Sequence, residues 1–219
     1  ITQVDYALGR IFGCLRENDL FKNTWVIFTA DHGEMLGDHH MSQKNLFFEG
    51  SAHVPLLIMP PQGRSLPHNI SVEAPTDLVD IYPTILAMAG LSSPVSVSGK
   101  NLLEPVPMDR MFFGNSLNRN FCVMEEKVKL VYSAIGDHVL LFDLNTDPME
   151  QHNLAEDPAW QERKAKLWKL LLEHTAQYTP EALGENGQFI TYEAPHFPGD
   201  VPGRWFGFHY HDYSVDTFH

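Results

Sequence analysis

The chain has 219 residues, of which 43% are hydrophobic and 20% are charged, so it is typical of one large globular domain or two small ones and not of a disordered or fibrous protein. Its formal net charge of −13 argues against a nucleic-acid or anionic-membrane partner, because both surfaces are negative. Its apolar runs are also far shorter than the roughly 20 residues that a membrane-spanning helix needs.

Residues 1–17 carry apolar side chains at helical spacing, which predicts an amphipathic helix. The stripe consists of Ile1, Val4, Leu8, Ile11, Phe12 and Leu15. The pattern starts at the first residue without a cap before it, so we expect the chain to begin inside a domain. A leader peptide upstream would be invisible, so a periplasmic or extracellular location and a cytoplasmic one both stay open.

Two short apolar runs follow this helix, at residues 24–30 and 54–59. Each is typical of a strand buried on both faces of a parallel sheet, so we expect an α/β arrangement with helices on both sides. The segment between the two runs is predicted to be a loop over the sheet edge, where open α/β sheets place their ligand sites. It opens with Asp31-His32-Gly33, and we expect Gly33 to permit a sharp turn.

A further helix is predicted over residues 76–89, with Pro83 either kinking it or opening its second part and Gly90 ending it. Its two acidic residues, Asp77 and Asp80, are of a catalytic type, but helix capping is the preferred interpretation. Residues 91–120 have the composition of loops.

The remaining chain predicts a small α+β layer. Residues 127–133 and 138–144 form a hairpin pattern around Gly136-Asp137, and a helix begins at Asp157-Pro158 and reaches about residue 177. Residues 179–219 are rich in aromatic residues without periodicity, so we expect an irregular strap over a preformed surface. The histidines of this tail, His196, His209, His211 and His219, resemble a metal-binding tract by composition only, and surface positions are preferred for them.

Several ordered motifs carry a likeness to a known family. They are Thr24-Trp-Val-Ile-Phe-Thr-Ala-Asp-His-Gly33, Gly37-Asp-His39, Lys44, Phe48-Glu-Gly-Ser-Ala-His-Val-Pro-Leu-Leu57, Asp77-Leu-Val-Asp-Ile-Tyr-Pro-Thr-Ile-Leu86, Ala89-Gly90, Val128-Lys-Leu130, Leu141-Phe-Asp-Leu144, Asp147-Pro148, Glu150 and Asn153-Leu154. In order and spacing this set resembles the sulfatase family of the alkaline-phosphatase superfamily. The likeness extends over about residues 1–175.

The likeness implies an alkaline-phosphatase-like mixed sheet flanked by helices, present here in part, with the small α+β layer behind it. We expect residues 1–120 to be the carboxyl-terminal part of the catalytic α/β domain, residues 121–178 to be a hairpin-plus-helix subdomain, and residues 179–219 to be the aromatic tail. Alone, the Asp31-His32 pair could equally be a solvated turn with Asp31 as a cap, although a carboxylate beside an imidazole also suits a divalent cation.

The likeness favours the metal interpretation. In the family a metal, usually calcium, is held by an early pair of Asp residues, by the nucleophile, and by an Asp followed by Asn, Gln or His; the last pair falls on Asp31 and His32. The His form resembles the branch that contains choline sulfatases and phosphonate monoester hydrolases. The family's Lys thirteen positions after that Asp falls on Lys44, where a cation would stabilise the sulfate and leaving-group charge. An exposed loop lysine is the plainer alternative for Lys44.

Three more histidines, His39, His40 and His53, belong to the same loop, and loop packing is the preferred interpretation for each. His53 stands where the family often has Arg, and an imidazole does not bind an anion as a guanidinium does.

The family's nucleophile is a Cys or Ser oxidised to formylglycine within a Cys/Ser-any-Pro-any-Arg segment, and no such segment occurs here. Neither Cys14 nor Cys122 is followed by it, and Ser65 and Ser92 have the Pro but lack the Arg. The two cysteines also leave the redox compartment open. We therefore expect the formylglycine and the early Asp pair to lie outside this sequence, in a missing amino-terminal half of the same protein.

The sequence thus predicts a hydrolase of sulfate esters, acting on a small-molecule or carbohydrate substrate through a calcium-assisted formylglycine mechanism. The fragment itself would be inactive and would bind calcium poorly, and its uncovered apolar surface could lead to self-association. A phosphonate monoester hydrolase or phosphodiesterase built from the same parts is the nearest alternative. A degenerate, non-catalytic binding module is an alternative from another class.

Overall fold

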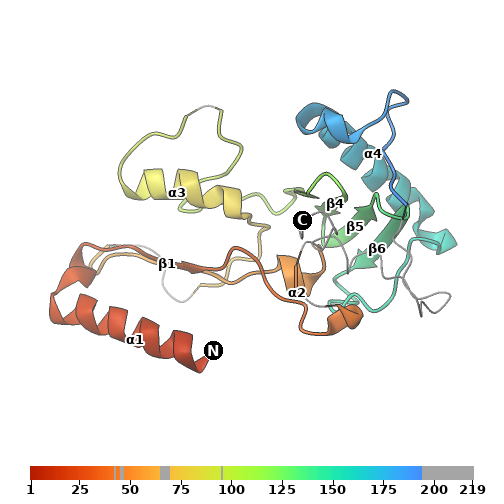
Figure 1. Ribbon diagram of the computed structural model, residues 1–219. Helices are drawn as coiled ribbons and strands as arrows, with labels where there is room; N and C mark the ends of the chain where they lie inside the picture. The colour runs from red at the N-terminus through yellow and green to blue at the C-terminus, as the bar shows by residue number, and fades with distance from the viewer. Residues whose placement is uncertain (42, 45–46, 65–69, 95, 194–219) are drawn as a thin grey trace, which may run out of the picture.

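The structure is a computed structural model that describes residues 1–41, 43–44, 47–64, 70–94 and 96–193 (Figure 1). The expectations for most of the aromatic tail, including its four histidines, lie outside the described residues. No helix in the described ranges has both the length and the apolar character that crossing a bilayer requires.

The amino-terminal lobe consists of α1 (Thr2–Glu17), the short 3-10 helix η1 (Leu20–Lys22), and the strands β1 (Val26–Thr29) and β2 (Leu56–Met59). The helix and both strands lie where their sequence patterns predict them. The strands pair antiparallel, with Val26 opposite Met59 and Thr29 opposite Leu56.

The expectation of parallel strands buried on both faces is wrong for this pair. Phe28 is 38% exposed and Leu57 is 60% exposed. After β1 the chain returns so that β2 runs in the opposite direction beside it. A continuous apolar run indicates that both faces of a strand need to be buried. It does not show that other residues of this chain bury them.

The loop between β1 and β2 contains the 3-10 helix η2 (Asp38–His40) and the one-turn helix α2 (Glu49–Ala52). In Figure 1, α2 lies between the β1–β2 ribbon and the carboxyl-terminal sheet. This loop therefore joins the two halves of the molecule.

The helix predicted over residues 76–89 consists of the 3-10 helix η3 (Leu78–Asp80) and α3 (Ile81–Met88). Pro83 lies in the first turn of α3, where its missing N–H breaks no helical hydrogen bond, so Pro83 helps to open the helix and does not kink it. Gly90 follows with φ of 72°, the left-handed conformation expected of a residue that ends a helix.

The carboxyl-terminal layer is built on a four-stranded antiparallel sheet in the order β3-β4-β5-β6. The strands are β3 (Phe112–Ser116), β4 (Asn120–Glu125), β5 (Val128–Ser133) and β6 (His138–Asp143). The predicted hairpin is confirmed as β5–β6, with Gly136 and Asp137 both at positive φ in the turn.

The sequence patterns do not predict two strands of this sheet, β3 and β4. The sheet begins at Phe112, inside the segment whose composition is typical of loops. The Gly114-Asn115-Ser116 and Asn118-Arg119-Asn120 segments have turn-like composition, so only short runs of strand-forming residues stand out, such as Phe112-Phe113 in β3. The strands form because each has a partner of matching register, with Phe112 opposite Met124 and Ser116 opposite Asn120.

One face of this sheet packs against α4 (Gln161–Tyr178), the helix predicted from Asp157-Pro158. The Asp157 carboxylate accepts a hydrogen bond of 2.9 Å from the Ala159 N–H, so the predicted cap is confirmed. The buried residues on this side are Phe121, Val123, Val128, Leu130, Tyr132, Ala134, Leu141, Ala155, Leu167, Leu171, Ala182 and Phe189. Phe189 shows that the start of the aromatic tail packs onto this layer and does not cover β1 and β2.

The other face of the sheet packs against the loop between β1 and β2. The buried residues of this second cluster, which we call the loop cluster, are Met35, Met41, Phe48, Cys122, Val131 and Phe142. Neighbouring strand residues alternate between the two clusters, as a strand's period of two requires. Because both faces are covered, all six residues of β5 are buried.

Candidate functional site

The turn after β1 carries the predicted metal pair. The Asp31 side chain is 87% exposed and the His32 side chain is 38% exposed, so both can be reached from solvent. The Asp31 carboxylate accepts a hydrogen bond of 3.0 Å from the His32 N–H, which folds the side chain back toward the imidazole. The pair therefore lies at the carboxyl end of β1 and is open to solvent.

Gly33 is required for a different reason from the one predicted. It is absent from the positive-φ residues, so it does not serve a left-handed turn. A Cβ at this position would lie 2.1 Å from the Gly50 carbonyl oxygen, and the Gly33 N–H donates to the Ser51 carbonyl at 2.7 Å. Glycine thus allows the turn to press directly against α2.

A hydrogen bond at Nδ1 orients the His32 ring. Nδ1 lies 2.8 Å from the Gly33 carbonyl oxygen. A carbonyl can only accept, so Nδ1 donates to it, which leaves Nε2 as the nitrogen that a metal ion would bind. Nε2 lies 3.4 Å from Oδ2 of the Asp31 carboxylate. The two atoms are close enough to bind one shared cation.

The third predicted site residue, Lys44, is exposed in the loop between η2 and α2. Within the described residues, no hydrogen bond or ion pair joins Lys44 to Asp31 or His32. The same residues contain no group of three or more His, Cys, Asp or Glu that could hold a metal ion. Asp31 and His32 are therefore a partial donor set.

Of the loop histidines, His39 has a packing contact, whereas His53 lies at the surface. The His39 ring stacks on Phe48 with ring centroids 4.2 Å apart. His53 Nδ1 lies 2.8 Å from a Glu49 carboxylate oxygen, and its side chain is 75% exposed. The side chain of His40 lies outside the described part of the structure.

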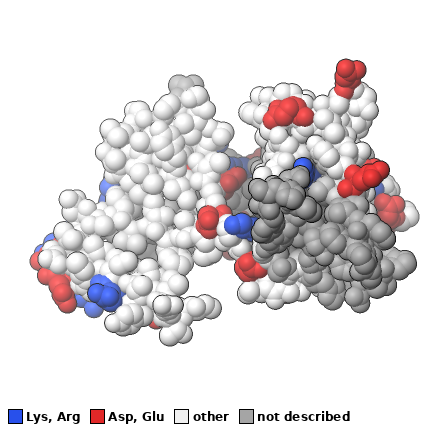
Figure 2. Space-filling view, in the orientation of Figure 1, with Lys and Arg blue, Asp and Glu red and all other residues white. Residues whose placement is uncertain are grey.

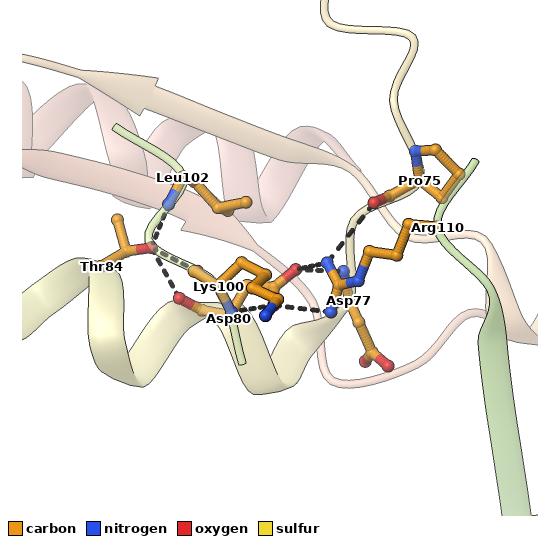
Figure 3. Close-up of polar contacts among 7 residues, drawn as sticks. All are labelled: Pro75, Asp77, Asp80, Thr84, Lys100, Leu102 and Arg110. Atoms are coloured by element: carbon orange, nitrogen blue, oxygen red, sulfur yellow. Dashed lines mark hydrogen bonds and ion pairs between the residues drawn. The ribbon is translucent and has the colours of Figure 1, made fainter. Parts of the chain in front are cut away.

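Asp77 and Asp80 form a reciprocal capping box at the start of η3, as predicted. Asp80 does more than cap, since its fully buried carboxylate accepts hydrogen bonds of 2.6 and 2.9 Å from the Arg110 guanidinium and one of 2.7 Å from the Lys100 N–H (Figure 3). Burial by itself would raise the pKa of Asp80, but these hydrogen bonds outweigh it and hold the pKa below its ordinary value. Asp80 is thus a structural anion.

The sequence patterns missed a buried ionic cluster beneath the loop. Lys129 on β5 is 3% exposed, and its ammonium donates to the carboxylates of Glu49 and Glu150 and to the Phe47 carbonyl. Burial by itself would lower the pKa of Lys129, but the negative groups around the ammonium raise it, so Lys129 is charged. A lysine within the otherwise apolar run of β5 was the available signal, because such a charge needs a partner.

Comparison with known proteins places these features in a family. The family model described as Sulfatase matches residues 1–91, the segment that holds the Asp31-His32 turn and Lys44. Arylsulfatase K from Xenopus laevis is 34% identical over 174 residues, which cover 70% of this chain and 32% of that protein. The chain belongs to the sulfatase family.

Other relatives of this sulfatase-family chain have broader descriptions. The multifunctional alkaline phosphatase superfamily protein PehA from Trinickia caryophylli is 34% identical over 201 residues, covering 78% of this chain and 39% of PehA. The crystal structure of phosphonate monoester hydrolase from Agrobacterium radiobacter is 32% identical, with a TM-score of 0.64 over 85% of this chain and 42% of that one. The described fold is therefore a partial alkaline-phosphatase-like fold. The chain spans about a third of the length of the curated relatives that it matches.

Proposed function

We propose that the protein containing this chain hydrolyses sulfate esters of small molecules or carbohydrates. The observation that carries the proposal is the Asp31-His32 pair, in which the Gly33 carbonyl orients the imidazole through Nδ1 and Nε2 lies 3.4 Å from an Asp31 carboxylate oxygen. The sulfatase family membership supplies the reaction class. The nucleophile, which we propose to be a formylglycine, and the further metal ligands would come from residues outside this sequence.

In this proposal Asp31 and His32 contribute two ligands to a divalent cation, for which calcium is the preferred candidate. The hard oxygen of Asp31 suits calcium, whereas an imidazole nitrogen such as that of His32 is a more usual ligand of transition metals, so calcium would need its further ligands to be oxygens. When bound, the cation would polarise the sulfate oxygens as a Lewis acid. The chain's own residues orient the ligands: the Gly33 carbonyl holds the imidazole through Nδ1, and the Asp31 carboxylate lies close to Nε2.

Lys44 has a separate role in the proposal. Cleavage of a sulfate ester leaves negative charge on the departing oxygen and on the sulfonyl oxygens, and an ammonium placed near them stabilises the transition state. Its exposed position leaves it accessible to a substrate.

A phosphonate monoester hydrolase or phosphodiesterase is the second candidate, favoured by the similarity to the Agrobacterium radiobacter enzyme and to PehA. The substrates have overlapping charge and shape, so the same residues serve either reaction. Assays of the full-length protein on matched aryl sulfate and aryl phosphonate esters separate the two. We expect the sulfate ester to be preferred, and a preference above a hundredfold for the phosphonate would overturn the first proposal.

The other alternative is that the protein is a degenerate, non-catalytic module. Reading the coding sequence upstream of Ile1 tests this alternative. We expect it to encode a Cys/Ser-any-Pro-any-Arg segment. If the start codon lies within a few residues of Ile1, both hydrolase proposals fail.

A further inference from the structure

We infer that Lys129 and Glu150, although they belong to the carboxyl-terminal layer, are positioning residues for the Asp31-His32 turn and the loop that carries Lys44. The inference rests on the function proposed above for those three residues. The contacts form an unbroken series from the interior of the carboxyl-terminal sheet to the turn after β1.

The first part of the series is the buried cluster under α2. The Lys129 ammonium donates to the Glu150 carboxylate and to the Phe47 carbonyl, each at 2.8 Å, and to Glu49. The second carboxylate oxygen of Glu150 accepts a hydrogen bond of 2.7 Å from the Glu49 N–H. One buried ion pair therefore holds the backbone of residues 47 and 49, which is the entrance to α2.

The second part runs from α2 to the metal pair. The Ser51 carbonyl of α2 accepts from the Gly33 N–H, and the Gly50 carbonyl occupies the space that a Gly33 side chain would need. A shift of α2 must therefore move the Asp31-His32 turn or break its contact with Gly33. Lys44 lies three residues before Phe47 in the sequence. Loss of the hydrogen bond from Lys129 to the Phe47 carbonyl would therefore also give Lys44 more freedom to move.

An ion pair holds this segment more strictly than apolar packing can. Packing specifies that a surface is covered, whereas hydrogen bonds to two carboxylates and a carbonyl specify where each atom lies. Apolar contacts also exist here, since Phe48 and Met41 pack in the loop cluster. The ionic cluster fixes the position of α2 relative to the sheet. A loop that carries catalytic residues needs such a fixed position.

Cys122 provides a reporter for this docking that does not depend on activity. Its side chain is fully buried in the loop cluster, beneath the segment that Lys129 holds. Burial raises the pKa of the Cys122 thiol to about 12, so it reacts slowly with thiol reagents while the loop is docked. The other cysteine, Cys14, is exposed and is replaced by Ser in every variant tested.

The experiment compares thiol labelling of Cys122 in three variants of this chain: Lys129→Met, Glu49→Gln and Lys166→Met. Lys166 pairs with Glu125 on the α4 side of the sheet, so Lys166→Met is a matched control that removes an ion pair without touching the loop. For Lys129→Met we expect labelling to become about 10- to 100-fold faster, the effect of losing a hydrogen bond to a charged group. For Glu49→Gln we expect a smaller increase, and for Lys166→Met none.

The direction of the effect separates release of the loop from a change in thiol chemistry. The positive charge of Lys129 lowers the pKa of the Cys122 thiol, so its loss alone would slow labelling. Faster labelling therefore reports an opened loop. Unchanged labelling in a folded Lys129→Met variant would overturn the inference. If Lys129→Met does not fold, Glu150→Gln decides, because it removes the charge that pairs with Lys129 in the interior while Glu49 still pairs with the ammonium; unchanged labelling in a folded Glu150→Gln variant would overturn the inference as well.

A second measurement uses the full-length enzyme. We expect Lys129→Met to lower kcat about 10- to 100-fold, with little change in KM, because the reacting groups are displaced while the substrate is still bound. Full activity in that variant would overturn the positioning role. If the unmodified enzyme cleaves no sulfate ester, the proposed function fails, whereas the labelling result still stands or falls separately.

Discussion

The role that we propose for Lys44 is the stabilisation of charge and not packing. Its side chain is exposed, so its loss removes no buried surface. In the full-length enzyme we expect Lys44→Ala to lower kcat by about 10²- to 10³-fold, the cost of removing one preorganised group that stabilises developing charge. The unfolding temperature of the Lys44→Ala variant should hardly differ from that of the unmodified enzyme. Steady-state kinetics and thermal unfolding check both parts, and normal turnover would remove Lys44 from the site.

Asp80 is the opposite kind of residue, important for stability and not for chemistry. We expect Asp80→Ala to lower the free energy of unfolding by about 3 kcal/mol, since Arg110 would be left partly buried without its counter-charge. Asp77→Ala removes a cap and should cost about 1 kcal/mol. Urea denaturation of the two variants measures the difference. Equal losses would show that the contacts of Asp80 with Arg110 and Lys100 add nothing to capping.

The lowered pKa of Asp80 also gives this contribution a pH dependence. A carboxylate with a depressed pKa in the folded state stabilises above its ordinary pKa of about 3.9, and the stabilisation is lost as the pH falls through the lower, folded value. The stability difference between wild type and Asp80→Ala should therefore shrink in acid. Denaturation curves collected between pH 7 and pH 3 check this, and a constant difference would contradict it.

At the level of elements, the contact between the β1 turn and α2 depends on a glycine. We expect Gly33→Ala to destabilise the chain and to speed labelling of Cys122, because the new Cβ would meet the backbone of Gly50 and not a movable side chain. Gly13→Ala in α1 is the matched control, since nothing lies within 4 Å of a Cβ there. That change should stabilise α1 by roughly 0.5–1 kcal/mol. Circular dichroism and thiol labelling of both variants test the pair, and similar effects in the two would contradict the close approach.

At the level of the whole molecule, the two lobes differ in how well they are covered. The sheet of the carboxyl-terminal layer is packed on both faces, whereas α1 has no buried residue. Its apolar residues Val4 and Ile11 are 59% and 55% exposed, and Leu57 on β2 is 60% exposed. Figure 2 shows that the visible face of this lobe carries few charged side chains, most of them near its lower left edge.

This uncovered surface leads to a prediction for the isolated chain. We expect it to self-associate or to bind an apolar dye, because soluble monomers rarely expose apolar patches above a few hundred Å². Light scattering and dye fluorescence measure the two outcomes, with Val4→Asp as a variant that should weaken both. A monodisperse monomer without dye binding would show that the lobe needs no further cover.

The sequence alone determined the features that depend on neighbouring residues. The periodicity of α1, the Asp157-Pro158 start before α4, the glycine turn between β5 and β6 and the capping role of Asp77 and Asp80 are local signals, and the structure confirms them. The ordered motifs around Asp31 also pointed to the sulfatase family. Their joint action with Lys44 remains a prediction, since the described residues hold only part of a metal site.

Only the tertiary structure decided how distant segments meet. The antiparallel pairing of β1 and β2, the strands β3 and β4, and the docking of the loop onto the sheet all depend on partners far along the chain. The Lys129–Phe47 hydrogen bond joins residues 82 positions apart, and the Glu49–Glu150 hydrogen bond joins residues 101 apart. A pattern of neighbours can indicate that a buried lysine needs a partner, but it does not identify that partner, because the contact depends on which surfaces the folded chain brings together.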